Sequence, residues 1–243
     1  MAKVTTDESN YTAIAGAIRT KLGVSTRYKP SEMASAIESI HGSSISIPNF
    51  KAGGSTSYPL EKVGVKLGPF RSGNSFITPT DDYGNDIFPK WNQPFEICVT
   101  FEITSLDSGG HALFGSKSGY YYIPSIEVRP QNNNFWCGWS TNGSSWTESM
   151  QIEGSDGLSL KTGTQIIVDA VYDGTEYTVT VNDGTNSISK SISVSGAHYY
   201  SNSRLLQFGG INVDSSHYAK CEIIDLSNTY IKENGVLIWG LEK

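Results

Sequence analysis

The chain has 243 residues and a formal net charge of −6, and Gly, Ser, Thr and Asn together make up 92 of its residues. The negative charge argues against a nucleic-acid ligand held through its phosphates. No stretch approaches the ~18 consecutive apolar residues of a membrane span, and Met1 is not followed by a basic and then an apolar segment, so we expect neither membrane insertion nor a secretory signal peptide.

Residues 1–42 have a helical pattern. The apolar residues of Tyr11–Leu22 recur at three- and four-residue spacing, and Gly23 ends this first helix. A second short helix opens at Lys29–Glu32 and ends at Gly42. A hairpin of about 40 residues seldom buries enough apolar surface to fold alone. We therefore expect it to dock on other proteins or to associate with copies of itself, most simply as a trimer.

Residues 43–59 form a junction rich in Gly, Ser and Pro, including Pro48, Gly53-Gly54 and Pro59. This composition is typical of a flexible linker. An early edge strand at Ile45–Ile47 is the alternative.

Residues 60–243 read as one all-β domain, because from Val63 onward the hydrophobic pattern has a period of two. The clearest case is Phe95–Ile103, whose alternation places Phe95, Ile97, Val99, Phe101 and Ile103 in the core. Similar runs are Ser125–Arg129, Phe135–Ser140, Gln165–Tyr172, Tyr177–Asn182, Ser187–Val194, Leu205–Phe208 and Lys220–Leu226. Tight-turn pairs such as Asp173-Gly174 and Asp183-Gly184 separate some of them. The pattern predicts an antiparallel sandwich or barrel.

The helical part is similar to a known module. Tyr11–Gly23 followed by Tyr28–Ile37, with the sequence Lys-Pro-Ser-Glu-Met at the junction, resembles a short helical module in tail proteins of phages and prophages of Gram-positive hosts. The resemblance covers about 30 residues. It implies a viral tail protein that is assembled in the host cytoplasm and resides in the virion.

The remaining chain resembles a concanavalin A-like (laminin-G-like) jelly roll. The matching pieces, in this order, are Phe95–Ile103, Ala112–Gly115, Ile166–Asn182, Leu205–Gly210 and Cys221–Ile231, with Gly235 and Trp239 after them. The resemblance implies two stacked antiparallel sheets in which the first and last strands lie side by side. We therefore expect Val63–Leu67 beside Lys220–Leu226.

The cysteines and histidines are scattered and show no metal-ligand spacing. There are three cysteines, an odd number, at Cys98, Cys137 and Cys221, so free thiols are expected rather than a disulfide framework. The four histidines are His41, His111, His198 and His217. The sequence predicts no metal site and no cofactor.

Paired carboxylates of the kind that glycosidases use are not evident. Glu222 and Asp225 are three residues apart, which places them on opposite faces of a strand, and Glu153 and Asp156 stand in a turn-rich stretch. We interpret all four as solvated or edge acids. Glycoside hydrolases of the jelly-roll superfamily carry a Glu-x-Asp-x-x-Glu strand, which this chain lacks, so the resemblance does not imply an enzyme.

The acidic loop Asp81–Asp86 is the only segment that suggests calcium. It lacks the alternating oxygen ligands and closing Glu of an EF-hand loop, so a solvated loop is favoured over a calcium site.

Aromatic residues in polar company give a stronger signal. A saccharide site needs flat aromatic side chains beside amide or carboxylate partners. The candidate binding residues are Tyr120, Tyr121, Tyr122, Asn132, Asn133, Asn134, Trp136, Trp146, Tyr199 and Tyr200.

Trp136 is the leading candidate because of its position in a strand. Phe135, Cys137 and Trp139 share one face, so Trp136 points to the other. If the first face is core, Trp136 lies on a sheet surface, unless it packs under a loop. Trp146 follows a turn in a segment that resembles an Asp-box hairpin, one residue short and with Asn in place of Asp, where a Trp either binds ligand or anchors its own hairpin.

These observations lead to a non-catalytic, lectin-like receptor-binding protein of a phage tail tip, which attaches to a saccharide of the host cell wall. Its N-terminal hairpin would bind other tail or baseplate proteins or form a homotrimer. The alternatives are a structural tail assembly or decoration domain, a polysaccharide-degrading enzyme, and a domain that binds a protein receptor. Retention on cell-wall polysaccharide, with or without release of reducing ends, discriminates among them.

Overall fold

The computed structural model divides the chain into two compact units, Met1–Ser46 and Ile47–Lys243. It describes residues 12, 15, 29, 48–53, 62–63, 66–68, 70, 76–116, 124–142, 145–194, 206–211, 214–219 and 221–241. The predicted helical hairpin at residues 1–42 and the alternative edge strand at Ile45–Ile47 therefore lie outside the described residues, apart from three single positions in the hairpin. No helix among the described residues is long and apolar enough to cross a bilayer.

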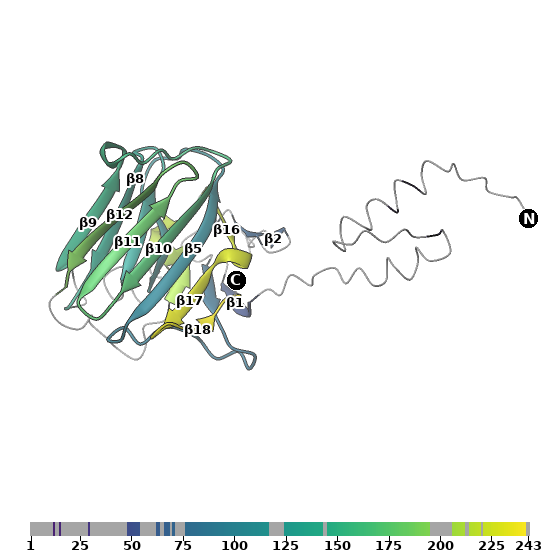
Figure 1. The fold of residues 1–243 in the computed structure, drawn as a ribbon, viewed down its shortest axis with the longest axis horizontal. Helices are drawn as coiled ribbons and strands as arrows, with labels where there is room; N and C mark the ends of the chain where they lie inside the picture. The colour runs from purple at the N-terminus through teal and green to yellow at the C-terminus, as the bar shows by residue number, and fades with distance from the viewer. Residues whose placement is uncertain are drawn as a thin grey trace, which may run out of the picture. The chain divides into compact units, whose positions relative to one another are not determined.

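The second unit is an antiparallel β-sandwich (Figure 1). One sheet has seven strands, in the order β1 (Phe50–Gly53), β4 (Phe76–Pro79), β13 (Leu206–Phe208), β6 (His111–Ser116), β7 (Ser125–Arg129), β8 (Asn134–Trp139) and β9 (Glu148–Glu153). An edge strand thus forms inside the junction that was predicted to be a linker, because β1 pairs with β4 from Phe50↔Pro79 to Gly53↔Phe76. The seven-stranded sheet therefore begins before the expected boundary at residue 60.

The second sheet has nine strands. Its main path runs β12 (Ser187–Ser193), β11 (Glu176–Asn182), β10 (Gln165–Tyr172), β5 (Phe95–Ile103), β16 (Glu222–Asp225), β3 (Lys66–Leu67) and β2 (Lys62–Val63). Strand β17 (Tyr230–Glu233) also pairs with β5, and β18 (Val236–Trp239) pairs with β17. The remaining elements are a small hairpin of β14 (Gly210–Ile211) and β15 (Asp214–Tyr218) and the 3-10 turns η1 (Gly154–Asp156) and η2 (Leu226–Asn228). Figure 1 shows β12, β11, β10 and β5 side by side.

Strand β5 confirms the predicted alternation. Its five core-side residues, from Phe95 to Ile103, are all buried. The opposite face of the strand is not open to solvent at its centre, since Cys98 and Thr100 are buried too. The segment that leads from η2 into β17 covers them, and the Thr100 hydroxyl donates to the carbonyl oxygen of Asn228 at 2.9 Å.

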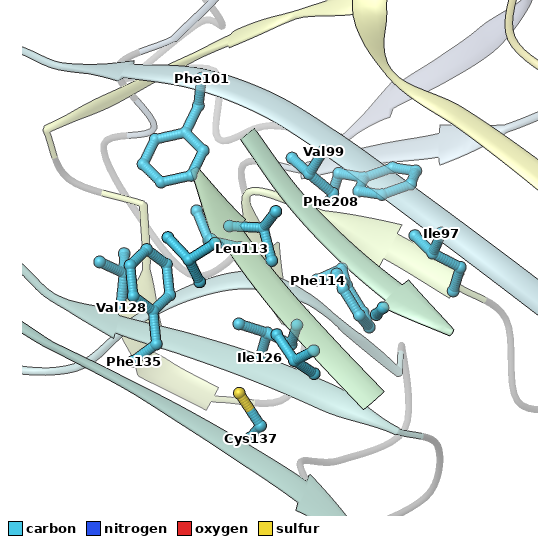
Figure 2. Close-up of a cluster of buried hydrophobic side chains, with 14 of the residues drawn as sticks. Ile97, Val99, Phe101, Leu113, Phe114, Ile126, Val128, Phe135, Cys137 and Phe208 are labelled. Carbon is cyan, nitrogen blue, oxygen red and sulfur yellow. The ribbon is translucent and has the colours of Figure 1, made fainter. Parts of the chain in front are cut away.

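The core lies between the two sheets. Figure 2 shows side chains of β5 facing side chains of β6, β7, β8 and β13 across this space: Ile97, Val99 and Phe101 on one side, and Leu113, Phe114, Ile126, Val128, Phe135, Cys137 and Phe208 on the other. All of these are fully buried. Each large apolar side chain withdrawn from water in this way contributes about 1.5–3 kcal/mol. The alternation in the sequence thus fixes which face of each strand points inward.

The expected pairing of the first and last segments is confirmed. Strand β16 pairs with β3 through Ile224↔Leu67 and Asp225↔Lys66. The two ends of the unit also meet elsewhere, because the indole N–H of Trp239 donates to the carbonyl oxygen of Asn49 at 2.7 Å.

The three thiols give a testable expectation. Cys98, Cys137 and Cys221 are all buried and free. Burial raises the pKa of Cys137, and burial together with the Glu222 carboxylate raises the pKa of Cys221 to about 12. Such a pKa leaves only about one thiolate in ten thousand at pH 8. A disulfide-exchange reagent should therefore react with Cys137 and Cys221 only after denaturation, and three thiols should then be counted without a reductant. A count of one would reveal a disulfide.

Candidate functional site

The outer face of the seven-stranded sheet carries the predicted aromatic site. The register of β7, β8 and β9 places two rows of side chains there, Glu127–Trp136–Gln151 and Arg129–Asn134–Glu153. Phe135 and Cys137 point the other way, into the core. The parity argument for Trp136 is therefore confirmed, since this side chain is half-buried on the face opposite to the core.

The Trp136 ring is packed, not isolated. The guanidinium carbon of Arg129 lies 4.3 Å from the centre of the ring, a distance typical of cation–π contacts. The Trp146 ring lies 5.5 Å away at an angle of 57°. The alternative in which Trp136 packs under a loop thus applies in part. The two indoles form a ledge that remains half-exposed.

Trp146 reaches this position because its loop folds back over β8. A Cβ atom on Gly138 would lie 2.0 Å from the Trp146 ring, so the ring rests directly on the glycine backbone. Only glycine leaves room for this approach. Trp146 therefore anchors its own loop, and it also forms part of the ledge.

A buried carboxylate positions Arg129. The Arg129 Nε donates to Glu127 Oε1 at 2.5 Å, and Glu127 is only 2% exposed. A charge-assisted bond to a buried carboxylate is strong and directional. It holds the guanidinium group over the indole, on a rigid pair of strands.

The three consecutive asparagines have different roles. Asn134 lies on the outer face, where its Nδ2 donates to Gln151 Oε1 at 2.7 Å and to Glu153 Oε1 at 3.0 Å. Asn133 has a positive φ of 52° and is used by the fold: its Nδ2 donates to Leu158 O at 2.6 Å and its Oδ1 accepts from Leu160 N at 2.7 Å. Asn132 is exposed in the turn. Of the three, only Asn134 lies beside Trp136 on the sheet.

The tyrosine candidates Tyr120–Tyr122 and Tyr199–Tyr200 lie outside the described residues. The strands that flank them are neighbours, however. Leu206, which follows the second cluster, pairs with Ser116, which precedes the first.

A hollow of about 290 Å³ lies on the same outer face, near the opposite edge of the sheet, over β1, β4 and β13. Phe76, Thr78 and Gln207 line it from the face opposite to the core residues Ile77 and Phe208. Lys51 and Asp86 also line it and form an ion pair at 3.1 Å. An aromatic ring, an amide and a charged pair in one hollow make it a second candidate site on the same outer face.

Comparisons with known proteins find similarity in structure only. No protein-family model matches the chain, and no characterised protein matches it in sequence. The binding domain of botulinum neurotoxin serotype D superposes with a TM-score of 0.53 at 12% identity, covering 80% of this chain and 44% of that one. The binding domain of botulinum neurotoxin DC, solved with rat synaptotagmin II, gives 0.50 at 14% identity, covering 76% and 44%. The likeness is one of fold.

A phage protein is also among the matches. Tailspike protein 2 of bacteriophage CBA120, in its enzymatically active domain, gives a TM-score of 0.49 at 11% identity, covering 77% of this chain and 29% of that one. The chain thus spans less than half the length of each of these three structures.

The interpretation of Glu222 and Asp225 as solvated or edge acids is wrong, because both side chains are buried. Glu222 and Asp225 do lie on opposite faces, but Glu222 points inward, is fully buried, and has His111 Nδ1 at 2.8 Å from its Oε1. Asp225 is buried and caps η2, where its Oδ1 accepts from Ser227 N at 3.0 Å. Neither the inward direction of Glu222 nor its partner follows from a local pattern, because the partner stands 111 residues away.

The other acids remain at the surface. Glu153 is exposed, and Asp156 forms an ion pair with Lys190 at 2.6 Å, a contact whose hydrogen bond lowers the pKa of Asp156. In the loop Asp81–Asp86, the Asp81 carboxylate accepts from the side chain of Asn85 at 2.8 Å and from backbone N–H groups, which lowers its pKa. This carboxylate is used to shape the turn.

Sequence reasoning missed several members of both candidate sites. Arg129, Glu127 and Gln151 join Trp136 only through strand register, and Phe76 meets Gln207 across 131 positions of sequence. Alignment of β8 with β9 around the turn between them would have placed Gln151 opposite Trp136. No local signal points to the hollow.

Proposed function

We propose that this chain is a lectin-like protein of a phage tail, in which a concanavalin A-like jelly roll binds a host cell-wall saccharide without cleaving it. The strands β3 and β16, one early and one late in the sandwich, pair side by side, as the resemblance to that fold leads us to expect. The binding face is the outer face of the seven-stranded sheet. The single observation that carries this proposal is the ledge of Trp136 and Trp146 beside the side chains of Asn134, Gln151 and Glu153.

The chemistry of this ledge suits a sugar ring. Half-exposed indoles offer an apolar surface to the C–H face of a pyranose, while amide and carboxylate groups accept and donate hydrogen bonds to its hydroxyls. Gln151 and Glu153 are exposed, so they are free to face a ligand. Strands β7 to β9 hold these groups in place before binding, which lowers the entropic cost of association.

Replacing Trp136 by alanine should weaken retention on cell-wall polysaccharide about tenfold or more, which corresponds to ~1.4 kcal/mol per factor of ten. The free energy of unfolding should fall by much less than the ~3–5 kcal/mol of a core tryptophan, because the ring is only half-buried. Binding is measured by isothermal titration with polysaccharide purified from Gram-positive cell walls, and stability by chemical denaturation of the same variant.

Tyr83→Ala is the matched control, because Tyr83 is an aromatic residue that is 91% exposed on a distant loop. It should leave binding unchanged. A Phe76→Ala variant tests the hollow in parallel. If Phe76→Ala abolishes binding while Trp136→Ala binds like the native chain, the ledge is not the site and the hollow takes its place.

The same assays separate the other functions. Release of reducing ends from the polysaccharide would make the chain an enzyme. A related fold is known in complex with a protein, rat synaptotagmin II, so binding to protease-sensitive host surface components would indicate a protein receptor. Failure to bind any cell-wall fraction would leave a structural tail domain.

The N-terminal region supplies the tail connection in this proposal. The apolar stripes of residues 11–40 would form the contact with other tail or baseplate proteins, or among three copies, in a virion assembled in the host cytoplasm. Several weak saccharide sites on one particle would then act together through a high effective concentration.

A further inference from the structure

Three metal-binding side chains converge at one end of the sandwich. They are His111 at the start of β6, Glu222 at the start of β16 and Cys221 directly before it. His111 Nδ1 lies 2.8 Å from Glu222 Oε1 and 3.5 Å from Cys221 Sγ, and the sulfur lies 3.4 Å from the same carboxylate oxygen. His111 and Glu222 are fully buried and Cys221 is 2% exposed.

The fold aims these groups at each other. Glu222 pairs with the core residue Ile103 and His111 pairs with the core residue Val128, so both side chains point into the space between the sheets. The loop after β5 fixes the cysteine, because the N–H and hydroxyl of Thr104 donate to the carbonyl oxygen of Cys221 at 2.7 and 2.9 Å. The cluster thus joins one sheet to the other.

We propose that His111, Cys221 and Glu222 bind one divalent transition-metal ion of the zinc type, which clamps the two sheets together. A nitrogen, a sulfur and an oxygen ligand form a set of intermediate softness that suits Zn²⁺. Ca²⁺ and Mg²⁺ are poor occupants, because they take oxygen ligands.

The spacing of the donor atoms is close to what such an ion requires. Tetrahedral bonds to zinc place neighbouring ligand atoms about 3.3 to 3.7 Å apart. The two separations that involve the sulfur, 3.5 and 3.4 Å, already fall in this range. The nitrogen–oxygen pair, now 2.8 Å apart, has to open by about half an ångström. A water molecule completes the fourth position.

The far side of the imidazole supports the assignment. His111 Nε2 is buried and has no hydrogen-bond partner among the described residues, while the carboxylate oxygen Oδ2 of Asp107 lies 3.8 Å away. Histidines that bind metal usually direct their second N–H at a carboxylate, which orients the ring. Coordination through Nδ1 leaves the ring proton on Nε2, facing Asp107.

Charge also balances in the bound state. On binding, Cys221 releases its thiol proton to solvent, and the thiolate and the Glu222 carboxylate together neutralise the double charge of the ion. A neutral complex of this kind is far less costly to bury than an isolated charge.

The test uses the full chain after treatment with a chelator. Titration with Co²⁺ should give one equivalent of binding and a thiolate-to-metal charge-transfer absorption, Zn²⁺ should displace the cobalt, and Zn²⁺ should raise the thermal midpoint. Cys221→Ser should abolish the charge-transfer band. Cys98→Ser is the matched control, since Cys98 is also buried and its thiol donates to the Asn228 carbonyl, at 3.7 Å, away from the three ligands, so this variant should bind normally.

A second variant keeps the test decisive if Cys221→Ser does not fold. Asp107→Ala retains all three ligands, alters a side chain that is 42% exposed, and should weaken metal binding by about 10- to 100-fold. Absence of the charge-transfer band in the native chain overturns the proposal. So does a Cys221→Ser variant that folds and retains the band.

Discussion

Replacing Trp139 by alanine should lower the free energy of unfolding by ~3–5 kcal/mol, close to the largest loss expected from a single core truncation. Trp139 is fully buried at the centre of an aromatic group. Its ring centre lies 4.6 Å from that of Tyr172 and 5.4 Å from that of Tyr177, and it stacks with Phe95 at 6.4 Å. The truncation removes these contacts and leaves a cavity between the two sheets, which the strands cannot close without shifting.

The measurement is chemical denaturation followed by far-ultraviolet circular dichroism, so that the transition is not read from tryptophan fluorescence. Trp136→Ala is the matched comparison, because Trp136 stands three residues earlier on the same strand and on the opposite face. The free energy of unfolding should fall by clearly less in Trp136→Ala than in Trp139→Ala. Equal losses for the two variants would contradict the assignment of Trp136 to the outer face.

Replacing His111 by alanine should cost a similar ~3–5 kcal/mol, for an electrostatic reason. The variant leaves the side chain of Glu222 fully buried without the imidazole that now lies 2.8 Å from it, and removal of one partner of such a buried pair is strongly destabilising. The experiment is done in the presence of a chelator, so that its outcome does not depend on any bound metal.

A double-mutant cycle with Glu222→Ala isolates the pair. Once the carboxylate is gone, removal of His111 should cost much less, so the double variant should be more stable than the sum of the single losses implies. Lys66→Ala serves as control, because the surface pair of Lys66 with Glu102 at 3.4 Å should contribute only about 0–1 kcal/mol. Additive losses in the His111–Glu222 cycle would show that the two groups do not stabilise each other.

Local periodicity accounts for what the sequence predicts well. In β5 the apolar residues alternate without interruption, and a period of two leaves only one face for the core, so Ile97, Val99 and Phe101 could be assigned without any knowledge of their partners. The same rule separates Trp136 from Phe135 and Cys137. Turn pairs such as Asp173-Gly174 then mark where β10 ends and β11 begins.

What escapes prediction depends on register between distant strands and on how loops return. The Glu222 carboxylate is buried because β16 aligns with β5 and places it opposite His111, a relation that no window of sequence contains. Cys98 and Thr100 are buried because a later segment crosses over them, although the alternation alone predicts that their side chains face solvent. Asn133 and Asn134 look alike in sequence, yet a positive φ commits the first to the turn.

The contact between Trp239 and Asn49 determines how such a domain can be attached to something else. Because the indole N–H of Trp239 reaches the carbonyl oxygen of Asn49 at 2.7 Å, the segments that carry residues 49 and 239 lie side by side. Domains whose two ends are adjacent can be inserted into a loop of a host protein, or circularly permuted, with little distortion. This sandwich therefore has the geometry of a module that can be joined to another protein as one piece.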